Sequence, residues 1–140
     1  MAKYVQDAHG RQFELLHSLG QGGQGEVFAV AGQLAIKVIR HTSQRRRDEL
    51  KDQFRWIRNL PEIAGLIKPK GLLREPDLGY WMELKSECFP ISRLIKPLST
   101  EKFTFAWCNN TGGLKKRLRV LTGLAEILSV LHSNGLAYSD

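Results

Sequence analysis

Apolar residues occur in short, β-prone runs through the first third of the chain. The first clear run is Val27 to Val30, and a second run, Leu34 to Ile39, follows the turn-prone pair Ala31-Gly32. Further upstream, residues Lys3 to Leu16 have the pattern of a hairpin whose turn is Asp7 to Gly10. We therefore expect these segments to form strands joined by hairpins.

A helical pattern follows the strands. Ser43 suits the N-cap position, and the pattern predicts a helix from there to about Asn59, stopped by Pro61. The apolar positions of this helix recur at helical spacing and are Leu50, Phe54 and Ile57, with Trp56 alongside. Two more strands are predicted beyond the helix, one within Ile63 to Leu73 and one from Tyr80, with a turn at Arg74 to Gly79 between them.

The second half of the chain is predicted to be helical. Ile91 to Leu98 predicts a short helix, whereas Phe103 to Gly113 predicts a loop because it contains Asn109-Asn110-Thr111-Gly112-Gly113. A long helix is expected next, ending before Gly135. Its apolar stripe consists of Leu114, Leu118, Leu121, Ala125 and Leu128, widened by Leu124 and Leu131.

The chemistry of the chain centres on the run Leu19-Gly20-Gln21-Gly22-Gly23-Gln24-Gly25-Glu26-Val27, which precedes Ala35-Ile36-Lys37. Glycines let backbone N–H groups approach phosphate oxygens without a Cβ in the way, and Lys37 supplies a positive charge. The glycine spacing also occurs in dinucleotide-binding proteins, but there it opens a helix, whereas here a strand follows. A Walker loop is excluded because the chain contains no Gly-Lys pair. The pattern therefore predicts an ATP site on a hairpin.

These motifs, in this order, resemble those of the protein kinase family. Tyr80 to Leu84 is similar to the fifth kinase strand running into the hinge, and Leu131 to Asp140 is similar to the end of the long helix and the start of the catalytic loop. The resemblance implies an α+β fold. It comprises a kinase-like N-lobe, an antiparallel sheet with one helix over about residues 13–83, followed by the hinge and the first C-lobe helices over residues 84–140.

The resemblance also implies the roles of individual residues. Lys37, Glu49 and Asp140 would be catalytic, and Met82 would be the gatekeeper beside the adenine. Mg²⁺ would accompany the ATP, with both metal ligands expected beyond Asp140 and none within the chain. The expected ATP-binding residues are Leu19, Gly20, Gln21, Gly22, Gly23, Gln24, Gly25, Val27, Ala35, Lys37, Met82, Glu83 and Leu84.

The acidic partner of Lys37 has three candidates. Glu49 is the first choice, but the hydrophobic register favours Gln53 at the family's glutamate position, and Asp52 is a third option. A glutamine there would remove the charge pairing. In the catalytic loop, Tyr138-Ser139-Asp140 replaces the family's His-Arg-Asp, so we expect little control by an activation-loop phosphate.

Composition narrows the class of protein. The 140 residues suffice for one core, and the two cysteines are too few for a disulfide framework. The net charge is +7, but the densest basic run, Arg45 to Arg47, is interleaved with acidic residues and predicts a solvated helix start rather than a nucleic-acid site. No apolar stretch approaches the length of a membrane span and no signal-peptide core is present, so we expect a cytoplasmic protein that binds neither nucleic acid nor membrane.

Three functions remain in view. The first is a protein kinase that phosphorylates Ser/Thr hydroxyls of a protein substrate, represented here by its first half and inactive alone. The second is a non-catalytic pseudokinase or nucleotide-binding regulatory module, favoured if Gln53 faces Lys37. The third, a small-molecule kinase of the same fold, is disfavoured because the glycine loop is so complete. The leucine stripe of residues 114–133 further predicts self-association or a partner chain that covers it.

Overall fold

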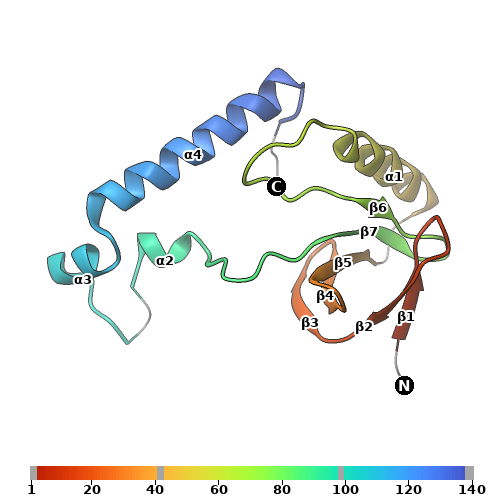
Figure 1. Ribbon diagram of the computed structural model, residues 1–140, viewed down its shortest axis with the longest axis horizontal. Coiled ribbons are helices and arrows are strands. Elements are labelled where there is room, and N and C mark those ends of the chain that lie inside the picture. Colours follow the sequence, from red (N-terminus) through yellow and green to blue (C-terminus); the bar gives the residue numbers. More distant parts are fainter. Residues whose placement is uncertain (1–2, 41–42, 98–99, 138–140) are drawn as a thin grey trace. The chain divides into compact units, whose positions relative to one another are not determined.

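The computed structural model describes residues 3–40, 43–97 and 100–137 of the chain and divides it into two compact units. The first unit contains Met1–Glu62 and Ile67–Ser86, and the second contains Ile63–Leu66 and Glu87–Asp140. The elements, drawn in Figure 1, are β1 (Lys3–Gln6), β2 (Gln12–Leu15), β3 (Ser18–Gly22), β4 (Gly25–Val30), β5 (Leu34–Ile39), α1 (Gln44–Arg58), β6 (Gly71–Leu72), β7 (Leu78–Glu83), α2 (Ser92–Ile95), α3 (Phe105–Asn110) and α4 (Gly113–Ser133).

The first unit is built on an antiparallel sheet of five strands in the order β3-β4-β5-β7-β6. The predicted strand pairs 27–30 and 34–39 form the hairpin β4–β5, in which Val27 lies opposite Lys37 and Ala29 opposite Ala35. Strand β7 pairs with the other side of β5. The predicted α+β class and the antiparallel sheet are therefore confirmed.

A separate hairpin, β1–β2, covers one face of this sheet. Val5, Phe13 and Leu15 of the hairpin form a buried cluster with sheet residues such as Ile36 and Val38. The turn of the hairpin lies where the sequence predicts it: the buried Asp7 carboxylate accepts hydrogen bonds from the N–H groups of His9 and Arg11, both at 2.9 Å. This local bonding explains why a carboxylate can be buried at the turn.

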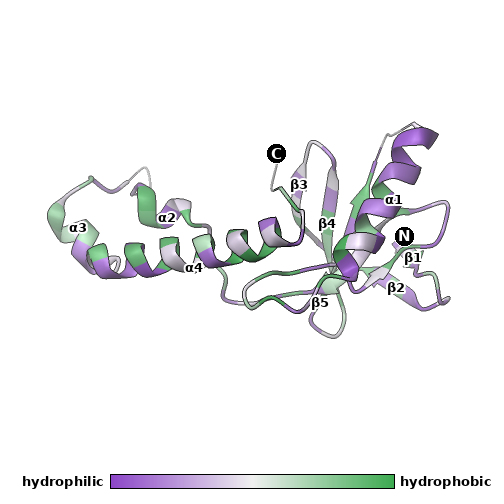
Figure 2. Ribbon diagram, turned by 90° about the horizontal axis from the view of Figure 1, so that it is seen from above, coloured by the Kyte–Doolittle hydropathy of each residue, from purple (hydrophilic) through white to green (hydrophobic). Residues whose placement is uncertain are grey.

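Helix α1 packs on the opposite face. The Ser43 hydroxyl accepts a hydrogen bond from the Arg46 N–H, which confirms Ser43 as the N-cap. Leu50 and Phe54 are the buried residues of the helix, and the Phe54 ring meets the edge of the Tyr80 ring with 4.8 Å between centroids. In Figure 2 most of α1 is coloured as hydrophilic, since only this narrow stripe contacts the sheet.

The second unit is helical, and its long helix agrees with the prediction. Helix α4 ends at Ser133, and Gly135, with φ of 77°, follows the C-cap residue Asn134. In Figure 2, hydrophobic and hydrophilic residues alternate along α4. Leu131 is its buried residue, whereas Leu114 remains 68% exposed within this unit. The predicted apolar stripe is therefore largely uncovered in the described part of the chain.

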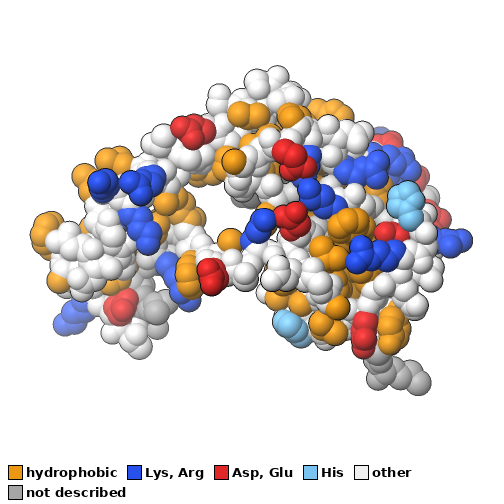
Figure 3. Space-filling view, in the orientation of Figure 1, with side chains coloured by type: hydrophobic (Ala, Val, Ile, Leu, Met, Phe, Trp, Pro, Cys, Tyr) orange, Lys and Arg blue, Asp and Glu red, His pale blue; other side chains and the backbone are white. Residues whose placement is uncertain are grey.

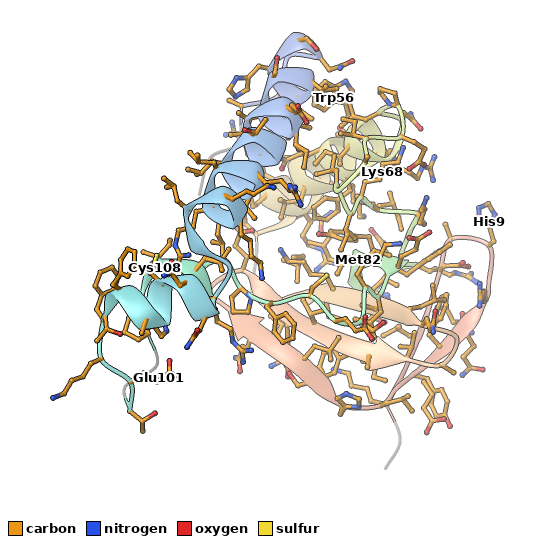
Figure 4. All side chains as sticks on the ribbon, turned by 60° about the vertical axis from the view of Figure 1, so that its left-hand side comes forward. His9, Trp56, Lys68, Met82, Glu101 and Cys108 are labelled. Carbon is orange, nitrogen blue, oxygen red and sulfur yellow. The ribbon has the colours of Figure 1, made fainter. Side chains whose placement is uncertain are left out.

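The loop predicted over Phe103 to Gly113 is wrong, because α3 occupies Phe105–Asn110. The Thr104 hydroxyl caps this helix by accepting a hydrogen bond from the Trp107 N–H at 3.0 Å. Trp107 is buried, and its indole N–H donates to Glu101. Figure 4 labels Cys108 on this helix and Glu101 on the segment that precedes it. The Asn-rich end of the segment closes the helix instead of forming a long loop.

Candidate ATP site

The glycine-rich run forms a β-hairpin from β3 to β4. Gly22 pairs with Gly25 and Gly20 with Val27, so that Gly23 and Gln24 make the turn. The register shifts between Ser18 and Gly20, which leaves Leu19 as an unpaired, exposed bulge residue. The N–H groups at the tip of this hairpin are the ones that the prediction assigns to phosphate.

The four glycines of the hairpin differ in what they do for the fold. None of Gly20, Gly22, Gly23 and Gly25 has a φ in the left-handed region. A Cβ added at Gly20, Gly22 or Gly23 would meet no described heavy atom within 4 Å. A Cβ at Gly25 would lie 2.2 Å from the carbonyl oxygen of Val38. Gly25 is therefore required by the close approach of β5, whereas the fold itself requires no glycine at the other three positions.

The backbone of these glycines differs from the expectation. We expected glycines that allow backbone conformations closed to other residues, but Gly20 and Gly22 lie in β3, Gly25 begins β4 and Gly23 lies in the turn, and none of them has a left-handed φ. Glycine in a strand weakens the sheet and marks a bulge, a bend or the close approach of a ligand or another backbone. Open space over Gly20, Gly22 and Gly23 leaves that approach unobstructed.

The strand register brings four of the other predicted ATP residues onto one face of the sheet, whereas Glu83, which follows Met82 on β7, is on the opposite face. Residues directly paired across strands share a face, as do residues two apart on one strand. Val27, Lys37 and Tyr80 are paired in this way across β4, β5 and β7, and Ala35 is paired with Met82. Val27, Lys37 and Met82 are partly exposed, while Ala35 is buried. Figure 4 labels Met82 on β7.

The face is the one that also carries α1. Where Ile39 and Leu78 lie on this face, the helix residues Leu50 and Phe54 pack on them and cover the sheet. The other face of the sheet holds Ile36 and is covered by the β1–β2 hairpin. On the face that carries α1, Lys37 has the apolar residues Val27 and Ala35 as neighbours on one side and the helix on the other. The Lys37 side chain remains partly exposed there.

None of the three candidate partners is paired with Lys37. The Glu49 carboxylate binds Arg45 at 3.2 Å and Arg46 at 3.1 Å, both within α1. Asp52 binds Arg55 at 2.8 Å. Gln53 is exposed. Among the described residues Lys37 has no ion pair, so the expected Lys37–Glu49 contact is not formed in this structure.

The hinge segment differs from the expectation at one atom. The Leu84 N–H donates to the carbonyl oxygen of Gln33 at 2.8 Å, so this group is engaged with the β4–β5 turn and does not point to a ligand. Glu83 is exposed, and a hydrogen bond from Lys85, together with its charge, holds the pKa of the Glu83 carboxyl below its usual range. The turn and the hinge border a polar hollow of about 470 Å³.

Arg40 is a residue that the sequence did not single out. Its guanidinium binds the Glu26 carboxylate, and its N–H donates to the Gln24 carbonyl at the tip of the hairpin. Both contacts attach the end of β5 to the glycine hairpin. Glu26 pairs with Val38 in the register, so this link lies on the face opposite Lys37. An acidic residue beside the last loop glycine was the only sequence signal for it.

The catalytic-loop prediction cannot be placed, since Tyr138, Ser139 and Asp140 lie outside the described residues. Over the described ranges, no group of three or more His, Cys, Asp or Glu residues could hold a metal ion. No helix within the same ranges is long and apolar enough to cross a membrane.

Comparisons of the chain with protein-family models, with curated proteins and with solved structures found no match. Its function is therefore inferred from the residues and geometry of the site.

Proposed function

We propose that this chain is the ATP-binding part of a protein kinase, which in the complete protein transfers the γ-phosphate of ATP to Ser/Thr hydroxyls. The observation that carries the proposal is the combination of two features. Three glycines that the fold does not need lie on a hairpin, and the following strands place Val27, Lys37 and Met82 on one partly accessible sheet face. The five-stranded antiparallel sheet with α1 packed on it is also the arrangement expected of a kinase N-lobe.

Each part of the site would bind a different part of ATP. Val27, Ala35 and Met82 offer apolar surface to the purine ring, which suits a flat aromatic ligand. Backbone N–H groups near Gly22 and Gly23 can donate hydrogen bonds to phosphate oxygens. The positively charged Lys37 ammonium attracts the same phosphates. The Leu84 N–H is excluded from adenine recognition because it already donates a hydrogen bond to the carbonyl oxygen of Gln33.

One observation favours a second function, a nucleotide-binding module without catalysis. In the first proposal Glu49 orients Lys37, yet its carboxylate is bound by Arg45 and Arg46, on its own helix. A lysine with no carboxylate partner still attracts phosphate but is less well oriented for transfer. Measured phosphotransfer by the complete protein separates the two functions, since both include ATP binding.

The test is a titration of the chain with a fluorescent ATP analogue. Lys37→Met removes the charge while keeping similar bulk, and we expect it to weaken binding at least about tenfold, because a direct charge contact to phosphate is lost. Lys3→Met is the matched control: it makes the same chemical change on β1, an element that covers the other face of the sheet. Equal affinities of Lys37→Met and the unmodified chain would contradict the proposed site.

The fold of the variants is tested alongside their binding. Lys37 is partly exposed and has no ion pair among the described residues, so its replacement should leave the unfolding midpoint in urea nearly unchanged. Loss of both ATP binding and folded structure would point to a structural role of Lys37 and would also contradict the proposal.

A further inference from the structure

The second unit contains two adjoining hollows between the segment around α2 and helix α4. Their volumes are about 310 and 400 Å³. Ile91, Leu94 and Val120 line both, so the two form one continuous groove, here named the α2–α4 groove. Its apolar lining includes Ile91, Leu94, Ile95, Phe103, Val120 and Leu121.

Arg117 holds the walls of this groove together. Its guanidinium donates to the carbonyl oxygens of Leu94, Cys108 and Gly113 at 2.9 to 3.2 Å, and it lies over the Trp107 ring at 5.2 Å. One side chain thus joins the α2 segment and α3 to the start of α4. The groove is therefore preformed, which reduces the entropy cost of binding a ligand there.

One of the two hollows is lined by positive charge that no described carboxylate neutralises. Arg93 and Lys116 are among its lining residues, and neither has a carboxylate partner in the described ranges. The Arg93 guanidinium lies over the Phe89 ring at 4.8 Å. All side-chain ion pairs found among the described residues belong to the first unit. Figure 3 shows Lys and Arg side chains gathered beside hydrophobic ones at the left of the view.

Helix α4 carries two lysines at positions that are unfavourable for the helix itself. Lys115 and Lys116 lie in its first turn, where no acidic residue is present and where the helix dipole disfavours positive charge. The helix would be more stable with carboxylates there. The positive charge of Lys116, which lines the groove, is explained better by a negatively charged partner than by the stability of the helix.

We propose that the α2–α4 groove binds an acidic amphipathic helix of a partner protein. The apolar side of such a helix would fill the two hollows, and its carboxylates would pair with Arg93 and Lys116. A second copy of this chain fits poorly, because two such grooves facing each other would bring like charges together. A membrane surface fits poorly as well, because the apolar residues of the groove surround hollows that side chains can enter. This proposal is independent of ATP binding.

A designed peptide provides the probe. It has about 16 residues, or roughly four helical turns, with leucines at helical i, i+3, i+4 and i+7 spacing and glutamates at the other positions. A second peptide carries lysines in place of the glutamates. We expect fluorescence anisotropy with the full chain to detect binding of the acidic peptide, weakened by added salt, and at least about tenfold weaker binding of the lysine peptide.

Matched variants locate the binding to the groove. Lys116→Glu reverses a lining charge, and we expect it to weaken the acidic peptide about tenfold or more. Lys115→Glu is the control, because it makes the same change in net charge and the same change at the helix N-terminus one residue away from the lining. Leu121→Ala is a second lining variant, which should weaken the apolar contacts without reversing a charge.

Several results would overturn the proposal. Equal binding of the two peptides, or equal loss in Lys115→Glu and Lys116→Glu, would show that the groove does not select an acidic helix. Dimers in sedimentation that Leu121→Ala abolishes would show that the groove joins two copies of the chain. Binding to phosphatidylserine vesicles that outcompetes the acidic peptide would show that a lipid surface is the ligand.

Discussion

Gly25 and Gly22 face each other across the glycine hairpin, yet the structure gives them opposite roles. We predict that Gly25→Ala destabilises the protein and that Gly22→Ala does not. The alanine Cβ at position 25 would lie 2.2 Å from the Val38 carbonyl oxygen and 3.0 Å from the Ile39 Cα, both of them backbone atoms of β5. Backbone in the middle of a sheet cannot move aside without disturbing its own hydrogen bonds.

The size of the effect follows from these contacts. Overpacking of this kind costs about 1–3 kcal/mol, a substantial part of the roughly 5–15 kcal/mol that stabilises a typical domain. Gly22→Ala meets no described heavy atom within 4 Å and has no left-handed φ to satisfy. Because alanine restricts the unfolded chain, that variant should be unchanged or more stable by about 0.4–1 kcal/mol.

For ATP binding we expect Gly22→Ala, the variant that does not lower stability, to have a clear effect. The open space over Gly22 is where phosphate is proposed to approach, so its added methyl group should weaken ATP binding several-fold in a protein that is still fully folded. Urea unfolding followed by circular dichroism measures the first effect, and titration with a fluorescent ATP analogue measures the second. If Gly25→Ala is as stable as the unmodified chain, the close β4–β5 contact is wrong. If Gly22→Ala binds ATP normally, the role given to the open glycines is wrong.

Two further predictions concern stability. Burial raises the pKa of the Tyr80 phenol, so the folded state holds this proton more tightly than the unfolded state does. The free energy of unfolding should therefore keep this contribution below about pH 10 and lose it as the pH rises further. Urea unfolding between about pH 9 and 11 should show a smaller loss of stability in Tyr80→Phe than in the unmodified chain. Equal losses in both proteins would contradict this. Arg117→Met should loosen the second unit, because the carbonyl oxygens of Leu94 and Gly113 lose the hydrogen bonds that the guanidinium donates. Amide hydrogen exchange should become faster in α3 and in the first turns of α4, and should stay unchanged in the β4–β5 hairpin. Unchanged protection in α3 would refute this prediction.

The sequence predicted the strands of the first unit well because each is short, β-prone and bounded by strong turn signals. Asp7 and Gly10 mark one turn and Gly32 another, and their local chemistry needs no distant partner. Helix α1 was likewise predicted from its N-cap, Ser43, and its apolar spacing. These features are local, so a pattern along the chain can show them.

Helix α3 was missed because its own residues disfavour a helix. Asn109, Asn110 and the glycines after them are typical of loops, and they outweighed the signal of Thr104, a capping residue three positions before Trp107. Burial of the Trp107 ring beside Arg117 stabilises this short helix. Such a tertiary contact is invisible to local propensity.

For the candidate site, the sequence could predict the strand register but not the contacts between side chains. Strand register follows from the hairpin, so the shared face of Lys37 and Val27 could be foreseen. The pairing of Glu49 could not, because Arg45 and Arg46 compete for the same carboxylate from the preceding turn. The need for glycine at position 25 depends on the distance to β5, which no sequence pattern contains.

The central claim, that Lys37 lies beside the phosphates of bound ATP, has a direct test. An ATP derivative with an acyl group on its terminal phosphate transfers that group to a nearby lysine amine: the new amide bond forms, the acyl–phosphate bond breaks, and ATP leaves as the amine loses its proton. Mass spectrometry of the digested chain then identifies the labelled residue. We predict labelling of Lys37 that excess ATP suppresses. Labelling spread over exposed lysines such as Lys3, or labelling of Lys37 that ATP does not suppress, would contradict the proposed site.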